Sequence, residues 1–193
     1  MINLNRNWFD NSMQNGIDIA GMITGNVERS QGFGETLDKI KLETSKVPNA
    51  IYFDEVHTGI DFGPGGSWIS IPGGYWEFIE KEEYAAIYRL YGSDLKMRIN
   101  HIDSIAINNL IKGTIYGGIN DILLPYPTES YGSGSGAHTH IDMTLNLPYN
   151  GYYTRQFVNP ETLRTKNWLE FQYRYYDINE YLISDRSNNF RRY

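Results

Sequence analysis

The sequence predicts a mainly β protein whose antiparallel sheets pack as a sandwich or open barrel, with little helix. Three observations predict this class. The composition is 40% hydrophobic and 15% aromatic with 16 tyrosines, which is typical of a globular chain rich in strands. From residue 50 onward, short runs of β-branched and aromatic residues are separated by turns such as GPGG and PGG. No alternation of strand and helix patterns supports a parallel α/β fold.

Seven short runs carry the strand prediction, and two short helices complete it. Residues 96–100, KMRIN, alternate polar and apolar side chains as a strand with one buried face does. One helix is predicted over residues 35–46 and another directly after Pro160, followed by an aromatic strand. The seven runs are AIYF (50–53), SWISI (67–71), YWEFIE (75–80), AAIYRLY (85–91), KMRINHI (96–102), GTIYGGI (113–119) and IDMTLNL (141–147).

The 193 residues are enough for one domain with its own core, and we divide them into three parts. We expect an N-terminal extension over residues 1–29, the β domain over 30–165, and an aromatic C-terminal extension over 166–193 that packs on the domain or trails from it. The best apolar stretch, residues 17–23, is short and contains Asp18, so no membrane span is expected. The first residues lack the basic start and apolar run of a signal peptide.

Charge and cysteine content exclude several kinds of partner and site. The net charge is −6 and the basic residues are dispersed, so we expect no nucleic-acid partner. The chain has no cysteine, which excludes disulfides and thiolate zinc sites. The loop YGSGSGAH (131–138) lacks the GK[ST] ending and the following helix of a phosphate-binding loop. It is therefore interpreted as a mobile connection into the next strand.

The chain has only four histidines, His57, His101, His138 and His140. In a strand, His138 and His140 would point to the same face, with ~7 Å between them along the strand. Two adjacent imidazoles are poor core residues because each needs a partner for its N–H and its lone pair. They are either a functional pair or two exposed surface histidines. His101, at the end of a predicted strand, is by itself equally well explained as a structural histidine.

The segment HTGIDF (57–62) places a histidine and an aspartate four residues apart, on one face of a helix or of a strand. Gly59 and the β-branched neighbours favour a strand. Taken alone, His57 and Asp61 are as well explained by a hydrogen-bonded turn. With an imidazole from HTH they make three N/O ligands, the set of a catalytic zinc that keeps a fourth position for water. The spacing leaves open whether His138, His140 or both would bind the metal.

A series of segments, in order along the chain, resembles the lysostaphin/LytM-type zinc endopeptidases that cut peptidoglycan peptides. VHTGIDF resembles the family's His-x-x-x-Asp zinc motif, and SGSGAHTHIDM resembles its small-residue loop and His-x-His motif. The resemblance covers about residues 30–163. Its supporting segments are SQGFGE (30–35), RINHID (98–103), IKGTIYGG (111–118) and FVNPETL (157–163).

This resemblance implies a LytM-like peptidase fold and one Zn²⁺ per chain. Carried over by position, it makes His57, Asp61 and His140 the zinc ligands and His101 and His138 the catalytic pair. It implies that a zinc-activated water hydrolyses peptide bonds in peptidoglycan cross-links or stem peptides. The protein would then act at the cell wall, as an exported enzyme, a phage lysin or a wall-targeting toxin.

The chain departs from the family pattern at three places. Glu35 stands where the family commonly has an arginine, Ile99 stands where it has a tyrosine, and residues 120–129 look inserted. None is a proposed ligand, so these departures bear on cleavage specificity more than on catalysis. The alternative functions are an inactive LytM-like module that binds the wall or a partner, a different zinc amide hydrolase, and an adhesive β-module with incidental histidines.

Overall fold

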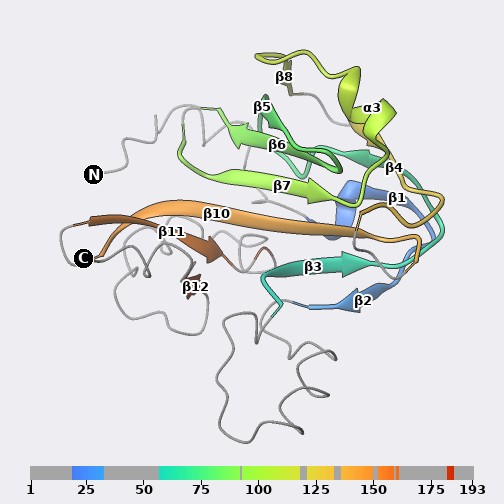
Figure 1. Cartoon of the computed structure of the whole chain (residues 1–193), viewed down its shortest axis with the longest axis horizontal. Coiled ribbons are helices and arrows are strands. Elements are labelled where there is room, and N and C mark those ends of the chain that lie inside the picture. Colours follow the sequence, from blue (N-terminus) through green and yellow to red (C-terminus); the bar gives the residue numbers. More distant parts are fainter. Residues whose placement is uncertain are drawn as a thin grey trace, which may run out of the picture.

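The structure, a computed structural model, describes residues 19–32, 57–91, 93–117, 121–132, 136–149, 152–158, 160 and 182–184. Within them the regular secondary structure consists almost entirely of antiparallel strands (Figure 1). This confirms the prediction of a mainly β chain with antiparallel sheets and little helix. The helices predicted over 35–46 and after Pro160, and the strand predicted over 50–53, lie outside the described residues.

The strands form two sheets. A three-stranded sheet has the order β1-β4-β9, and a nine-stranded sheet has the order β12-β11-β10-β7-β6-β5-β8, with β3 pairing with β10 and β2 pairing with β3. The strands are β1 (Ile23–Gly25), β2 (Arg29–Gln31), β3 (Gly59–Phe62), β4 (Gly66–Ser70), β5 (Trp76–Lys81), β6 (Ala85–Leu90), β7 (Lys96–Asn100), β8 (Ile115–Tyr116), β9 (Ile122–Pro125), β10 (Thr139–Tyr149), β11 (Tyr152–Val158) and β12 (Leu182–Ser184).

Strand β10 is the longest of these strands and connects the two parts of the large sheet. Its first residues pair with β3 on one side and with β7 on the other, and its later residues pair with β11. His140 therefore lies opposite Asp61 of β3 and opposite Asn100 of β7. The start of β10 is flanked on both edges, which holds its side chains in register with those of two neighbouring strands.

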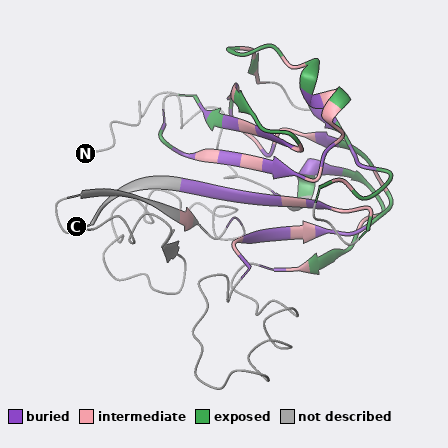
Figure 2. Ribbon diagram, in the orientation of Figure 1, coloured by how far each residue is buried: buried purple, intermediate pink, exposed green. Residues whose placement is uncertain are grey.

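Both sheets contribute to one apolar core (Figure 2). The alternation in β7 buries Met97 and Ile99 and leaves Lys96 and Arg98 partly exposed, as the sequence pattern predicts. Trp76 of β5 is fully buried, and its indole N–H donates to the Gly73 carbonyl at 2.8 Å, so burying this large ring leaves no unpaired N–H. Burial of such side chains supplies most of the driving force for packing the sheets together.

Six of the seven predicted strand runs contain strands, namely β4, β5, β6, β7, β8 and β10. The segment of residues 120–129 contains β9, which pairs with β4, and buries Leu123, Leu124 and Tyr126 in the core. This segment departs from the family pattern in sequence, yet it is an integral part of the small sheet. Its apolar side chains explain why the chain forms a strand there.

Two short helical elements accompany the strands. The 3₁₀ turn η1 (Ala20–Met22) precedes β1, and helix α3 (Ser104–Asn108) follows β7. Helix α3 was not predicted from the sequence; Asp103 caps it by accepting a hydrogen bond from the Ile105 N–H at 2.8 Å. Over the stretches that the structure describes, no helix is long and apolar enough to cross a membrane.

Parts of both predicted extensions join the sheets. Strand β1 lies within residues 1–29 and pairs with β4, and Met22 beside it is fully buried in the core. Strand β12 lies within residues 166–193 and pairs with β11. These two strands are therefore paired with strands of the predicted β domain.

Candidate metal centre

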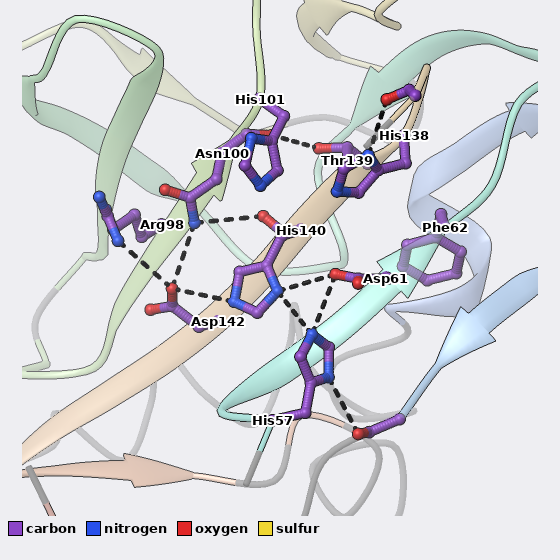
Figure 3. A network of polar contacts seen from close by, with 12 residues as sticks. His57, Asp61, Phe62, Arg98, Asn100, His101, His138, Thr139, His140 and Asp142 are labelled. Atoms are coloured by element: carbon purple, nitrogen blue, oxygen red, sulfur yellow. Dashed lines mark hydrogen bonds and ion pairs between the residues drawn. The ribbon is translucent and has the colours of Figure 1, made fainter. Parts of the chain in front are cut away.

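His57, Asp61 and His140 meet at the start of β10 (Figure 3). The two imidazole atoms that face each other are His57 Nε2 and His140 Nδ1, which lie 2.9 Å apart. Asp61 Oδ1 lies 2.8 Å from His140 Nδ1 and 3.1 Å from His57 Nε2. The three atoms form a nearly equilateral triangle of two nitrogens and one carboxylate oxygen, a group that can hold a metal ion.

Strand pairing brings these three residues together although 83 positions separate the two histidines. Asp61 and His140 are register partners in β3 and β10, and His57 lies two residues before the start of β3. Gly59 allows the close approach. A Cβ on Gly59 would lie 2.3 Å from the Ile141 carbonyl oxygen and 2.9 Å from Cε1 of His140. The glycine of HTGIDF is thus required by the contact with β10.

The remaining ring nitrogens determine which atoms are free to bind a metal. His57 Nδ1 lies 2.9 Å from the Gly32 carbonyl oxygen, which can only accept, so Nδ1 carries the proton. His140 Nε2 lies 3.4 Å from Asp142 Oδ2, which orients its N–H in the same way. Each ring therefore turns its other nitrogen toward Asp61. An oxygen acceptor behind a ligating histidine is the usual arrangement around protein metals.

Asp142 is itself held in place behind His140. Its carboxylate is 3% exposed and accepts a hydrogen bond from Asn100 Nδ2 at 3.2 Å. Arg98 NH1 lies 3.9 Å from the same carboxylate, and its NH2 also pairs with Glu82. Sequence reasoning did not identify Asp142 or Asn100 as site residues. The signal for Asp142 was its position two residues after His140, on the same face of the strand.

In the metal-free protein, His57, Asp61 and His140 share one proton. Burial disfavours the charged form of His140, but hydrogen bonds and attraction from Asp142 and Asp61 outweigh burial and raise its pKa to about 9. Burial likewise disfavours the Asp61 carboxylate, but the hydrogen bonds and charge of His140 and His57 hold its pKa well below its usual range. The metal-free group thus holds one proton between an ionised carboxylate and two imidazoles.

The spacing of the three atoms fits a small tetrahedral cation. Bonds of ~2.0–2.1 Å to nitrogen and oxygen place tetrahedral ligands ~3.3–3.4 Å apart. The observed separations of 2.8, 2.9 and 3.1 Å are slightly shorter, and an expansion of a few tenths of an ångström would accommodate the ion. Three protein ligands leave a fourth position open, as in catalytic zinc sites.

His101 and His138 lie beside this group, with their ring centroids 4.4 Å apart. His101 Nδ1 lies 2.9 Å from the Tyr131 carbonyl oxygen, and His138 Nδ1 lies 2.8 Å from the Gly136 carbonyl oxygen. Both rings therefore donate through Nδ1 and keep a lone pair on Nε2. Strand β10 begins at Thr139, so His138 precedes the strand and contacts His101, while His140 joins the ligand group.

The backbone and surroundings of His101 are unusual. Its φ is 61°, in a region that residues other than glycine rarely adopt, and such conformations cluster at functional sites. Burial lowers the pKa of His101, and His138 and His140 lower it further, against the opposing effects of the Tyr131 carbonyl and Asp61. The neutral imidazole is therefore favoured at this position.

Two open clefts flank the group. One lies along β6 and β7 and reaches His101 and His140, and the other lies along β2 and β3 and reaches Asp61 and His138. The β6–β7 cleft is further lined by Glu82, Glu83, Tyr84, Ala85, Arg98, Asn100 and Gly132. The β2–β3 cleft is further lined by Ser30, Gln31, Gly63, Pro64, Gly136 and Ala137. An extended chain that runs from one cleft to the other across the start of β10 would pass His101, His138 and His140.

No protein-family model matches the chain, and no curated protein matches it. The geometry of this site and the order of the motifs along the sequence are therefore the observations from which a function can be inferred.

Proposed function

We propose that the protein is a zinc-dependent endopeptidase that hydrolyses peptide bonds in peptidoglycan cross-links or stem peptides. One observation carries the proposal. Two imidazole nitrogens and a carboxylate oxygen converge within 3.1 Å of one another, and each imidazole is oriented by an oxygen acceptor on its far side. Three converging acceptors repel one another unless a proton or a cation lies between them. The motif order that resembles the LytM-type family supports the peptidoglycan substrate.

The proposed roles follow from the contacts of each side chain. His57, Asp61 and His140 would hold Zn²⁺, which when bound supplies Lewis acidity and makes water acidic enough to attack at neutral pH. His138 Nε2 carries the lone pair that accepts the proton of the attacking water and returns it to the leaving amine. His101, whose ring centroid lies 4.4 Å from that of His138, is neutral at rest and keeps a lone pair on Nε2. Its Nε2 would first take up a proton, and the imidazolium would then stabilise the charge that develops on the scissile carbonyl oxygen.

The clefts on either side support an extended peptide substrate. The β2–β3 cleft is lined mainly by small and uncharged residues, while the β6–β7 cleft carries Glu82, Glu83 and Arg98. A peptide that crosses the ligand group would place its scissile bond between these clefts, next to both catalytic histidines. A protein that cuts such a substrate would act at the cell wall.

The test combines metal content with peptide cleavage. The purified protein is loaded with zinc, its metal content is measured, and new amino termini are counted after incubation with cell-wall preparations and short bridge peptides. His57→Ala and His140→Ala are expected to lose bound zinc and activity together. His138→Ala is expected to keep zinc and to lose at least about a hundredfold in kcat, because it removes only the proton acceptor.

A matched control is Asp94→Ala, which removes an exposed carboxylate from the turn between β6 and β7. It should leave both readouts unchanged. Zinc binding without cleavage of any wall preparation would contradict the peptidase and favour a non-catalytic wall-binding module. Cleavage of other amides but not of wall peptides would favour a different zinc hydrolase.

A further inference from the structure

Tyr126 connects the small sheet to the backbone of β3, the strand that carries Asp61. It follows directly after β9, is 4% exposed, and does not belong to the ligand group or its oxygen acceptors. We propose that Tyr126 is a positioning residue that sets the spacing between Asp61 and His140 for metal binding. This inference rests on the metal site of the proposed function but on no particular substrate or reaction.

The Tyr126 hydroxyl meets the ends of both ligand-bearing strands. Its O–H is shared between the Phe62 carbonyl oxygen at 2.6 Å and the Gly63 carbonyl oxygen at 2.5 Å. Thr139, the register partner of Phe62, also acts on the phenol: its backbone opposes the burial that raises the pKa of Tyr126. The hydroxyl thus lies where the end of β3 meets the start of β10. The two short hydrogen bonds, in a buried position, hold the Phe62 and Gly63 carbonyls in one arrangement.

The position of this contact matters because of the strand register. Phe62 pairs with Thr139, and the adjacent pair is Asp61 with His140. Figure 3 shows Phe62 and Thr139 next to these two ligands. Any change in the separation of the Phe62–Thr139 pair is passed along the two strands to the ligand pair. Metal binding is sensitive to such a change because bond lengths tolerate only ~0.2 Å.

The small sheet holds Tyr126 from the other side. Its backbone N–H donates to the Ser67 carbonyl of β4 at 3.1 Å. The ring lies over Gly66, where a Cβ would come within 2.4 Å of a ring carbon. The side chain is therefore fixed at both ends, between Gly66 and the strands that carry the ligands. A hydroxyl held this firmly can define a distance rather than adapt to it.

Tyr126→Phe tests the proposal because it removes one oxygen atom and keeps the ring on Gly66. The dissociation constant for Zn²⁺ is measured by competition with a chromophoric chelator. We expect it to rise about tenfold, the lower end of the range for residues that orient ligands indirectly. The visible absorption of the Co²⁺-loaded protein should also change, because it reports the ligand geometry at the metal.

The matched control is Tyr88→Phe. Tyr88 is also fully buried, but its hydroxyl has no hydrogen-bond partner among the residues that the structure describes. This variant should leave the zinc dissociation constant and the cobalt spectrum unchanged. Gly66→Ala tests the position of Tyr126 in a second way, because the added methyl group displaces the Tyr126 ring without removing its hydroxyl. It too should weaken zinc binding.

The outcomes separate this inference from the proposed function. If Tyr126→Phe lowers only the melting temperature of the metal-free protein and leaves zinc affinity and the cobalt spectrum unchanged, Tyr126 is merely structural and the inference is overturned. If the unsubstituted protein binds neither Zn²⁺ nor Co²⁺, the metal centre itself is overturned together with the inference. If it binds metal but cuts no peptide, only the proposed function fails, and the zinc affinities still decide the role of Tyr126.

Discussion

At the scale of single residues, the site depends on oxygen atoms that accept hydrogen bonds from the far side of the two imidazole rings. The Gly32 carbonyl orients His57, and the Asp142 carboxylate orients His140. Each acceptor binds the N–H of the ring nitrogen that it faces and leaves the opposite ring nitrogen aimed at Asp61. The ligand set is therefore defined by which tautomer each imidazole adopts, and the tautomer is defined by residues that never touch the metal.

Asp142→Asn tests this dependence on the oxygen behind His140. The amide nearly preserves volume but removes the charge that attracts the His140 N–H, so zinc affinity is expected to fall about tenfold. Titration calorimetry with Zn²⁺ measures the change. Glu82→Gln, which alters the exposed partner of Arg98 one step farther away, serves as the control and should bind zinc normally. Equal affinities for Asp142→Asn and the unsubstituted protein would show that Asp142 does not support the site.

The raised pKa of His140 predicts opposite pH effects on folding and on metal binding. A pKa raised from 6.5 to about 9 means that the folded, metal-free protein holds this proton more tightly than the unfolded chain. The resulting stability is fully present below about pH 6.5 and is lost as the pH rises through about 9. Thermal melting of the metal-free protein across this window should show a falling melting temperature.

Zinc must displace the same proton, so its affinity should rise across the same window and level off above about pH 9. Zinc titrations at several pH values measure this slope, and the proton released on binding can be detected in weakly buffered solution. His140→Ala removes the group and should abolish the pH effect on stability. An affinity that stays constant between pH 6.5 and 9 would contradict the assignment of the proton to His140.

At the scale of elements, β10 organises the site because β3 and β7 pair with its first residues on opposite edges. This places Asp61 of β3 and Asn100 of β7 on either side of His140. The close contact of β3 with β10 depends on Gly59, whose missing side chain makes room for the Ile141 carbonyl and the His140 ring. Gly59 thus permits the close approach of the two ligand-bearing strands.

Gly59→Ala should separate β3 from β10 and damage the site and the sheet together. The added Cβ would lie 2.3 Å from a backbone oxygen that cannot move without shifting the strand. We expect the free energy of unfolding to fall by about 1–3 kcal/mol, as for other overpacked positions, and zinc affinity to fall with it. Urea denaturation and zinc titration measure the two effects.

The control for this variant is Gly63→Ala, just beyond the end of the same strand. A Cβ there would meet only the Glu28 carbonyl oxygen at 3.5 Å, which is ordinary contact. Its unfolding free energy and zinc affinity should remain close to those of the unsubstituted protein. If both alanine variants behaved alike, the clash at Gly59 would not be the cause.

At the scale of the whole molecule, the two sheets share one core. Asp61 and His140 lie on strands of the larger sheet. Tyr126, which follows a strand of the smaller sheet, contacts the end of β3 beside Asp61. The metal joins the segment before β3 to the start of β10, which are far apart in sequence. Any ion bound there links distant segments in the folded state only. Metal binding should therefore stabilise the entire domain.

Removal of the metal should lower the melting temperature of the protein. At a free zinc concentration about one hundred times its dissociation constant, binding adds ~2.7 kcal/mol, which for a domain of this size is roughly 5–10 °C. Calorimetry of chelator-treated and zinc-loaded samples measures the difference. The His57→Ala protein should show no such shift. A shift that persisted in this variant would place the bound ion elsewhere.

Local pattern was sufficient to predict half of the described strands and the residue types that converge at the site. Alternating and aromatic runs indicated β4 to β8 and β10, and the spacing in HTGIDF and HTH indicated the imidazoles and the carboxylate. Strands β1, β2, β9 and β11 and helix α3 were not predicted. Of these, β1, β2, β9 and α3 are short and gain their stability from pairing or from one capping residue. The LytM-type activity remains a prediction from the motif order.

Residue types and their spacing were enough to nominate the ligands, because side-chain chemistry and strand period are local properties of the chain. The choice between His138 and His140 was not local. It depends on where β10 begins and which residue it sets opposite Asp61, and this follows from long-range strand pairing. The roles of three further residues also depend on the folded structure. Gly32 and Tyr126 act through hydrogen bonds to residues that are remote in sequence. Asp142 acts on the His140 ring, whose direction is set by packing. Contacts between segments that are far apart in sequence form only when the sheets fold, so a local sequence pattern does not predict them.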